Sequence, residues 1–338
     1  MNTDLAPCPR IEWGAEIRAG SGVYKRFRQG DQGLLTNDLT GYVSFRQETG
    51  MAAHAYHISQ PIRRNTCVVF ASPHSGSDYA PAFLRRSVLD PHTIRSSEDA
   101  FVDLLFESAT EFGAPFLKAG APRAYVDLNR SADELDPALI EGARPHGHNP
   151  RVASGLGVIP RVVANGRAIY RGKLTMTEAR QRIDRYWRPY HDALANLLGE
   201  ARALFGQAIL IDCHSMPHEA LETVARGTGQ RPQIVLGDRF GAAADGEIVD
   251  RVEAAFVGAG LTVSRNSPFA GAFVTQTYGR PSRNQHAIQI EIDRSVYMDE
   301  RRLRPNRDFD AFRALLHGVV GEIAAIGGQE PEMPLAAE

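Results

Sequence analysis

Two short apolar runs, each followed by a histidine, constrain the fold of this chain most strongly. The first run spans residues 67–72 and leads to His74, and the second spans residues 208–211 and leads to Asp212 and His214. Continuous apolar runs of this length are typical of strands that are buried on both faces of a sheet. Because ligands of open α/β sheets bind beyond the carboxyl ends of the strands, we expect both imidazoles to face one cleft.

Composition favours a globular protein with a small-molecule partner. The 338 residues are 43% hydrophobic, and the formal net charge is -2, with no basic run that would indicate nucleic acid or an anionic membrane as a partner. Residues 1–13 lack the apolar segment of a signal peptide, and the three cysteines, Cys8, Cys67 and Cys213, form no CxxC pattern. We therefore expect a cytoplasmic protein with reduced thiols. The sequence is compatible with a homo-oligomer and does not define the oligomeric state.

Apolar runs and helical repeats alternate along most of the chain, which is typical of an α/β fold. We expect an α/β/α sandwich around a mixed, mostly parallel central sheet. The predicted parts are an N-terminal extension or edge hairpin over residues 1–60, a single α/β domain over residues 61–328 and a disordered tail over residues 329–338. Further strands are predicted at 123–129, 233–236, 261–264 and 286–293, and helices from Ser96 onward and at 175–205, 246–257 and 308–326.

Acidic residues at the predicted helix start near Ser96 have two interpretations. Glu98 and Asp99 would lie in the first helical turn, where carboxylates favour the helix dipole without any ligand. Asp99 and Asp103 are four residues apart and would share one face of this helix. If Asp99 binds a metal, Asp103 would be placed to orient a histidine.

The strand predicted at 286–293 carries a carboxylate in an unusual place. Ile288, Ile290 and Ile292 alternate with Gln289, Glu291 and Asp293, so the two sets occupy opposite faces. A carboxylate in so apolar a strand is costly unless a cation or a hydrogen-bond network meets it. Two histidines and a carboxylate are the ligand set of catalytic zinc sites, which keep a fourth position open for water.

His146 and His148 lie in a Gly- and Pro-rich loop, where we expect solvent exposure.

Several motifs, taken in order over about residues 65–325, resemble those of the N-formylglutamate amidohydrolases, also called N-formylglutamate deformylases. The matching stretches are Ser72-Pro73-His74-Ser75-Gly76, Glu98-Asp99, Tyr125-Val126-Asp127-Leu128-Asn129-Arg130, Ile169-Tyr170-Arg171-Gly172, Trp187-Arg188-Pro189-Tyr190-His191, Ile211-Asp212-Cys213-His214-Ser215, Tyr278-Gly279-Arg280-Pro281 and Gln289-Ile290-Glu291. The resemblance implies a zinc-exopeptidase-like α/β/α fold, one zinc ion per chain and a distant kinship with the zinc carboxypeptidases.

The resemblance also implies the metal ligands. His74 and His214 match the metal histidines of the family. Zinc carboxypeptidases place a glutamate close after the first histidine, but Ser77 stands three residues after His74 here. The third ligand is therefore expected at Asp99, in the acidic motif, with Glu98 as the alternative.

The remaining site residues follow from the same resemblance. Glu291 matches the catalytic carboxylate, which would take a proton from water and return it to the leaving nitrogen. Asn129 and Arg130 match the pair that grips the α-carboxylate of the substrate, and Arg123 would polarise the scissile carbonyl. Arg280 is a candidate for an acidic substrate side chain.

The function implied is zinc-dependent hydrolysis of an N-acyl amino acid, with N-formyl-L-glutamate as the first expectation and glutamate and formate as products. One alternative keeps the fold and the metal but changes the substrate to another N-acyl amino acid or a peptide C-terminus. A second alternative is a non-catalytic binding protein of the same fold.

Overall fold

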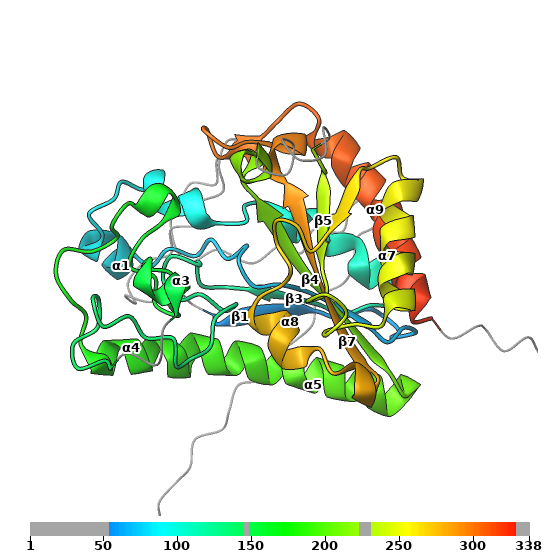
Figure 1. The fold of residues 1–338 in the computed structure, drawn as a ribbon, viewed down its shortest axis with the longest axis horizontal. Coiled ribbons are helices and arrows are strands. Elements are labelled where there is room, and N and C mark those ends of the chain that lie inside the picture. The colour runs from blue at the N-terminus through cyan, green and yellow to red at the C-terminus, as the bar shows by residue number, and fades with distance from the viewer. Residues whose placement is uncertain (1–53, 145–148, 223–230, 329–338) are drawn as a thin grey trace, which may run out of the picture. The chain divides into compact units, whose positions relative to one another are not determined.

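The computed structural model describes residues 54–144, 149–222 and 231–328, and these contain one large sheet (Figure 1). Its seven strands lie in the order β1-β3-β2-β4-β7-β5-β6. Their bounds are β1 Tyr56–Ser59, β2 Val68–Ser72, β3 Phe116–Ala119, β4 Ala208–Met216, β5 Ile234–Gly237, β6 Val263–Arg265 and β7 Gln285–Asp293. A separate two-stranded ribbon pairs β8 Met298–Asp299 with β9 Arg304–Pro305.

The centre of the sheet is parallel. Strand β2 pairs in parallel with β3 and β4, and β4 pairs in parallel with β7, whereas β1 and β5 run antiparallel to their neighbours β3 and β7. In the β4–β7 pair, His214 lies opposite Glu291. The parallel arrangement brings the carboxyl ends of β2, β4 and β7 to one edge, where a ligand cleft is expected in such sheets. The predicted mixed, mostly parallel sheet is confirmed.

Helices cover both faces of this sheet (Figure 1). On one face, α5 Arg188–Phe205 packs against β2 and β4, beside the short helix α8 Phe273–Tyr278. On the other face, α7 Gly246–Gly258 and α9 Phe309–Ile326 pack against each other, and α2 Val102–Leu105 contacts α9. The α/β/α architecture is therefore as predicted. No helix in the described ranges is long and apolar enough to cross a membrane.

The long helical segment predicted at 175–205 forms in three parts. Helix α4 Met176–Arg182 begins with a capping box, in which Thr175 accepts from the Glu178 amide and Glu178 accepts from the Thr175 amide. A π-helical turn over Ile183–Trp187 joins α4 to α5. The turn ends just before Pro189, whose nitrogen has no hydrogen to donate within a helix. The long segment thus stays continuous at a residue that usually interrupts helices.

Two of the predicted elements are wrong, namely the strand at 123–129 and the helix that begins at Ser96. Residues 123–129 form turns and no strand, because Tyr125 and Val126 donate backbone bonds to the Pro122 carbonyl. The strand beside β2 is instead β3, at residues 116–119, which the sequence analysis did not predict.

No regular helix begins at Ser96. The chain makes a 3-10 turn over Thr93–Ser97, extends at Glu98 and turns left-handed at Phe101, with φ of 67°, before α2 begins. Glu98 and Asp99 therefore lie in an irregular segment, outside any helical first turn.

Further short helices and 3-10 turns connect these elements. They are α1 Pro81–Arg86 and α3 Pro150–Ala153, with 3-10 turns over Glu107–Phe112, Ala164–Gly166, His218–Leu221, Pro281–Arg283 and Arg294–Val296. Strand β1 alternates half-buried and exposed side chains at the sheet edge. Most of the predicted 1–60 extension, the 329–338 tail, His146 and His148 lie outside the described residues. Cys67 and Cys213 are buried free thiols.

Candidate active site

The loop after β2 places His74 at the edge of the sheet. It turns tightly at Gly76, where a Cβ atom would come within 2.2 Å of the Ala121 carbonyl oxygen. Only glycine fits against this neighbouring backbone. The His74 carbonyl accepts a 3.1 Å hydrogen bond from the Asp99 amide, so the loop and the acidic segment are fixed against each other.

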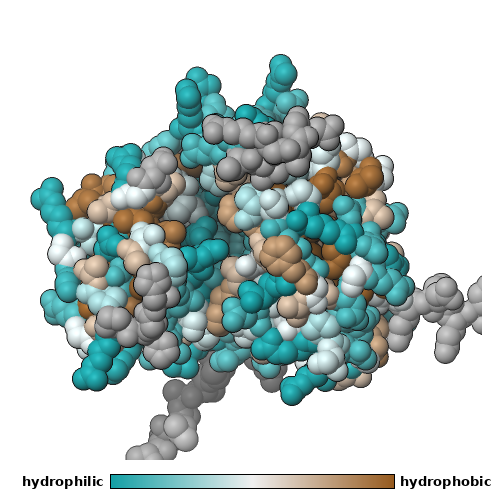
Figure 2. All heavy atoms as spheres, in the orientation of Figure 1, coloured by the Kyte–Doolittle hydropathy of each residue, from teal (hydrophilic) through white to brown (hydrophobic). Residues whose placement is uncertain are grey.

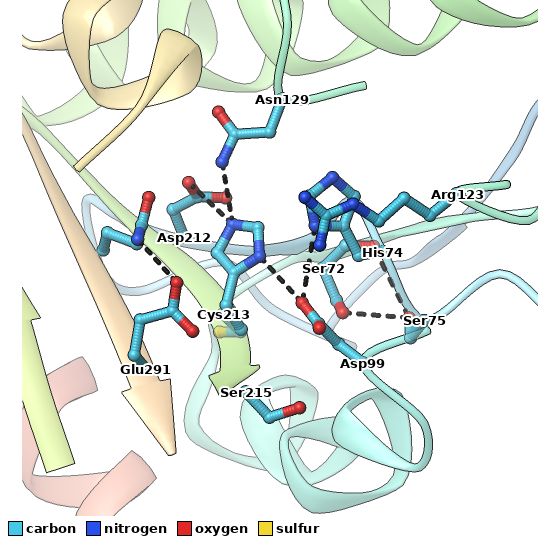
Figure 3. A network of polar contacts seen from close by, with 12 residues as sticks. Ser72, His74, Ser75, Asp99, Arg123, Asn129, Asp212, Cys213, Ser215 and Glu291 are labelled. Atoms are coloured by element: carbon cyan, nitrogen blue, oxygen red, sulfur yellow. Dashed lines mark hydrogen bonds and ion pairs between the residues drawn. The ribbon is translucent and has the colours of Figure 1, made fainter. Parts of the chain in front are cut away.

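Three buried side chains converge at this edge (Figure 3). His214 Nδ1 lies 2.9 Å from Asp99 Oδ2, and His74 Nδ1 lies 3.4 Å from the same oxygen. One nitrogen of each ring and one oxygen of Asp99 all lie within 4.8 Å of one another. Two imidazole nitrogens and a carboxylate oxygen form a donor set that suits a catalytic zinc ion.

A further carboxylate lies next to the outer nitrogen of each ring. His74 Nε2 lies 2.7 Å from Asp127 Oδ1, and His214 Nε2 lies 3.1 Å from Asp212 Oδ2. The contact of His74 with Asp127 is a hydrogen bond, and a proton on His74 Nε2 leaves Nδ1 as a lone-pair donor that faces the cluster. Metal-binding histidines are commonly oriented by carboxylates in this way. Asp127 therefore favours the tautomer of His74 that a metal needs.

The polar atoms of the cluster fit a cation. His74 Nδ1 is buried and has no hydrogen-bond partner among the described residues. Burial alone would raise the pKa of the Asp99 carboxyl, but the hydrogen bond with His214 and the nearby His74 ring hold this pKa well below its usual range. Asp99 is therefore ionised, which gives the cluster a permanent negative charge toward a metal.

Arg294 neutralises part of that charge from the other side. Its Nη2 donates to Asp99 Oδ1 at 3.0 Å and to the Glu98 carbonyl at 2.7 Å, and its Nε donates to Ser215 Oγ. Asp99 thus keeps Oδ2 toward the histidines while Oδ1 is held by the guanidinium. Arg294 was not among the residues expected in the site, although it directly follows the carboxyl end of β7, where polar side chains reach the cleft.

The alternative ligand Glu98 does not join the cluster. Its carboxylate is buried and accepts three hydrogen bonds of 3.1–3.2 Å from the Arg95 guanidinium. Asp103 does not orient a histidine either, because its Oδ2 accepts from Lys118 Nζ at 3.1 Å. The expected pairing of Asp99 and Asp103 on a helix face is wrong, since no helix connects them. Asp127 takes the place that was expected for Asp103.

Glu291 lies beside the cluster on β7. Its Oε1 accepts a 2.8 Å hydrogen bond from Gln289 Nε2, and its side chain is buried at the cavity wall. Burial raises the pKa of Glu291 to about 7. A carboxylate with a pKa near neutrality is suited to accept and return a proton at neutral pH.

A cavity of about 610 Å³ opens above these residues. In Figure 2 a hydrophilic hollow lies between the side that carries α1 and α3 and the side that carries the strands. The floor includes His74, Asp99, His214 and Glu291. The walls are partly apolar and include Leu156, Pro160, Val162, Val163 and Phe269. The volume suits a small molecule.

Four arginines line this cavity, namely Arg123, Arg130, Arg151 and Arg294. Arg123 Nε donates to Asp127 Oδ2 at 3.0 Å, which places its guanidinium next to His74. Arg130 is 6% exposed, and its Nε has no hydrogen-bond partner among the described residues. A buried guanidinium without a partner is suited to an anionic ligand.

Asn129 and Arg280 were both expected to contact the substrate, but the structure gives them other partners. The Asn129 side chain approaches His214 Nε2 at 3.1 Å and accepts from the Val274 amide at 2.8 Å, so it supports the histidine and α8. Arg280 is exposed and donates to the carbonyls of Gln276 and Gly279, away from the cavity lining. The expectation that Arg280 faces the pocket is wrong.

Comparisons with known proteins agree with this site. The family model described as "N-formylglutamate amidohydrolase" matches residues 66–298. The chain belongs to the N-formylglutamate amidohydrolase family. It is therefore a hydrolase that acts on amide bonds, and His74, Asp99, His214 and Glu291 all lie inside the matched range.

Individual relatives extend the comparison. An N-formylglutamate deformylase of Pseudomonas aeruginosa is 31% identical over 69% of this chain and 82% of its own length. The crystal structure of an N-formylglutamate amidohydrolase from Ralstonia eutropha JMP134 is 35% identical, covers 80% of this chain and 98% of its own, and superposes with a TM-score of 0.75. A gene product from Agrobacterium tumefaciens, 16% identical, covers 81% of this chain and 95% of its own with a TM-score of 0.58, which indicates a shared fold.

Proposed function

We propose that this protein is a zinc-dependent deformylase that hydrolyses N-formyl-L-glutamate to L-glutamate and formate. The observation that carries the proposal is the buried group of His74, Asp99 and His214 beside Glu291, on the floor of a cavity lined by arginines. Membership of the N-formylglutamate amidohydrolase family supports the same substrate.

The metal would be held by Nδ1 of His74, Nδ1 of His214 and Oδ2 of Asp99, the three atoms that face one another. When bound, zinc supplies Lewis-acid polarisation of a carbonyl oxygen and lowers the pKa of water. Asp127 would keep the His74 ring in the required tautomer. The predicted cytoplasmic location and the zinc stoichiometry of one per chain remain part of this proposal.

Glu291 would act as the general base and then as the general acid. Its carboxylate accepts a proton from the attacking water, whose oxygen bonds to the formyl carbon. The carbon–nitrogen bond then breaks, and Glu291 returns the proton to the leaving nitrogen, so that formate and the amino group are released. A pKa of about 7 suits both transfers, because each form of the carboxyl is accessible near neutrality.

Two arginines would position the substrate during this reaction. Arg130 would bind the α-carboxylate, because its buried guanidinium has no hydrogen-bond partner at Nε among the described residues. Arg123 would stabilise negative charge on the formyl oxygen, because Asp127 fixes its Nε beside His74. Asn129 would support the site through His214, which its Nδ2 approaches at 3.1 Å, and it also lines the cavity.

A substrate panel tests this proposal. Formate, acetate or amino acid release is measured for N-formyl-L-glutamate, N-acetyl-L-glutamate, N-formyl-L-alanine and a dipeptide that ends in glutamate. We expect the highest kcat/KM for N-formyl-L-glutamate. A clear preference for the dipeptide or for N-formyl-L-alanine would contradict the proposed substrate.

A further inference from the structure

The four arginines of the cavity fall into two pairs. Arg123 and Arg294 each donate to a buried carboxylate, at 3.0 Å to Asp127 and at 3.0 Å to Asp99. Within the described residues, Arg130 and Arg151 form no ion pair and no side-chain hydrogen bond. In the part of the chain that the structure describes, the cavity therefore presents two cationic groups that form no ion pair with a protein carboxylate.

These two unpaired groups lie close enough to repel. Burial lowers the pKa of the Arg130 guanidinium. The charge of Asp127 opposes this shift, whereas the nearby charges of Arg151 and Arg123 add to it. Holding two like charges next to each other in one cavity costs free energy, and anions that bind between them recover it. A ligand with two separate carboxylates would satisfy both guanidiniums.

Hydrogen bonds fix the backbone of the segment that carries Arg151. Asn149 Oδ1 accepts from the amides of Arg151 and Val152 at 3.0 and 3.3 Å. Arg161 links the end of α3 to the protein, because it donates to the Ala153 carbonyl and to Asp136 Oδ2. The backbone of Arg151 is thus fixed, while its exposed side chain lines the cavity mouth.

The wall between floor and mouth is apolar. Pro160, Val162, Val163 and Phe269 line it together with Leu156. An amino acid side chain with methylene groups before its terminal carboxylate would pack here and keep its charge toward the mouth. The arrangement distinguishes a deep cationic group, Arg130, from an outer one, Arg151.

We infer that Arg151 binds the side-chain carboxylate of the substrate and thereby sets a preference for N-acyl amino acids with an acidic side chain. The inference rests on the proposed function, in which Arg130 binds the α-carboxylate. Arg151 thus takes the function that was expected for Arg280, which lies away from the cavity. The preference for an acidic side chain then depends on the segment around α3.

The test compares N-formyl-L-glutamate with N-formyl-L-glutamine, which has the same shape without the charge. Wild type, Arg151→Gln and Arg151→Lys are assayed as full-length zinc-loaded proteins. Arg180→Gln is the matched control, since Arg180 is an exposed arginine on α4 that does not line the cavity. Arg151→Gln should lower kcat/KM for the glutamate substrate about tenfold or more, chiefly through KM.

The same substitution should change kcat/KM for the glutamine substrate less than about twofold, and Arg151→Lys should retain part of the preference. Equal losses for both substrates, or an unchanged ratio between them, would overturn the inference. Calorimetric binding of L-glutamate and L-glutamine provides a readout without turnover. If wild type releases no formate, the proposed function fails, while a loss of L-glutamate binding in Arg151→Gln still supports the inference and unchanged binding overturns it.

Discussion

Asp127 Oδ1 lies 2.7 Å from His74 Nε2 and also accepts the Asn129 amide, so this carboxylate fixes the ring that faces the candidate metal site. Burial alone would raise the pKa of Asp127, but the charges of His74 and Arg123 hold it well below its usual range. Asp127 is therefore ionised and accepts the His74 proton. The second function of Asp127 is to hold Arg123 through Oδ2.

Asp127→Asn should weaken zinc binding about 10- to 100-fold, because an amide holds the His74 tautomer less firmly than a carboxylate. Competition with a chromophoric chelator measures this affinity. Asp136→Asn is the matched control, since Asp136 is also buried and bonded to an arginine, Arg161, but does not line the cavity. Unchanged zinc affinity in Asp127→Asn, with the fold intact by circular dichroism, would contradict the assigned function of Asp127.

Asp99→Asn should sharply lower zinc occupancy, whereas Glu98→Gln should leave it nearly unchanged. Asp99 Oδ2 faces both histidines, but the Glu98 carboxylate faces Arg95. Elemental analysis of both purified variants measures the occupancy. A larger loss in Glu98→Gln than in Asp99→Asn would move the ligand assignment to Glu98.

Glu291→Gln should retain zinc and lose activity by about 10² to 10⁴-fold, the usual contribution of a general base. In the wild type, activity requires the ionised carboxylate, so kcat/KM should fall as pH drops below the Glu291 pKa. Burial sets this pKa at about 7, and a bound dication would lower it, so the acid limb should lie at or below pH 7. A profile of kcat/KM that stays flat from pH 4.5 to 8 would exclude Glu291 as the base.

Gly76→Ala should destabilise the protein by about 1–3 kcal/mol, because the new Cβ atom would clash with the Ala121 carbonyl oxygen. The clash pushes the loop that carries His74, so zinc affinity should fall together with stability. Urea unfolding and the chelator competition measure the two effects. Gly172→Ala is not a suitable control, because its φ of +77° is itself strained. Gly199→Ala is suitable, because its Cβ would meet nothing within 4 Å.

The strands that carry the site were predictable from sequence because they are buried on both faces. Continuous apolar runs at 67–72 and 208–211 and the alternating run at 286–293 correspond to β2, β4 and β7. Once these strands are parallel, their carboxyl ends meet, so His74 and His214 could be placed at one cleft without coordinates.

The segment at 123–129 shows why other elements were not predictable. Ala124, Val126 and Leu128 are all fully buried, and their alternation is the pattern of a strand. The chain nevertheless turns here, because Pro122 accepts two backbone bonds and Asp127 donates to the Val158 carbonyl. An alternating pattern of apolar residues shows which side chains are buried. In a tightly turned segment, buried side chains can alternate in the same way as in a strand.

The segment that carries Glu98 and Asp99 differs from its predicted helix for a related reason. Apolar spacing at Val102, Leu105, Phe106 and Ala109 is met by a four-residue helix and a 3-10 turn. A left-handed Phe101 interrupts the chain before α2, and non-glycine residues rarely adopt this conformation, so no local pattern indicates it. The partner of Asp103 is Lys118 on β3, a strand that periodicity did not indicate.

Zinc titration of the metal-free protein tests the central claim most directly. Protein stripped by a chelator and dialysed is given increasing zinc, and formate release from N-formyl-L-glutamate is measured at each addition. We expect negligible release without metal and a linear rise that ends at one zinc per chain. Full formate release by the metal-free protein, or none after one equivalent of zinc is bound, would contradict zinc-dependent catalysis.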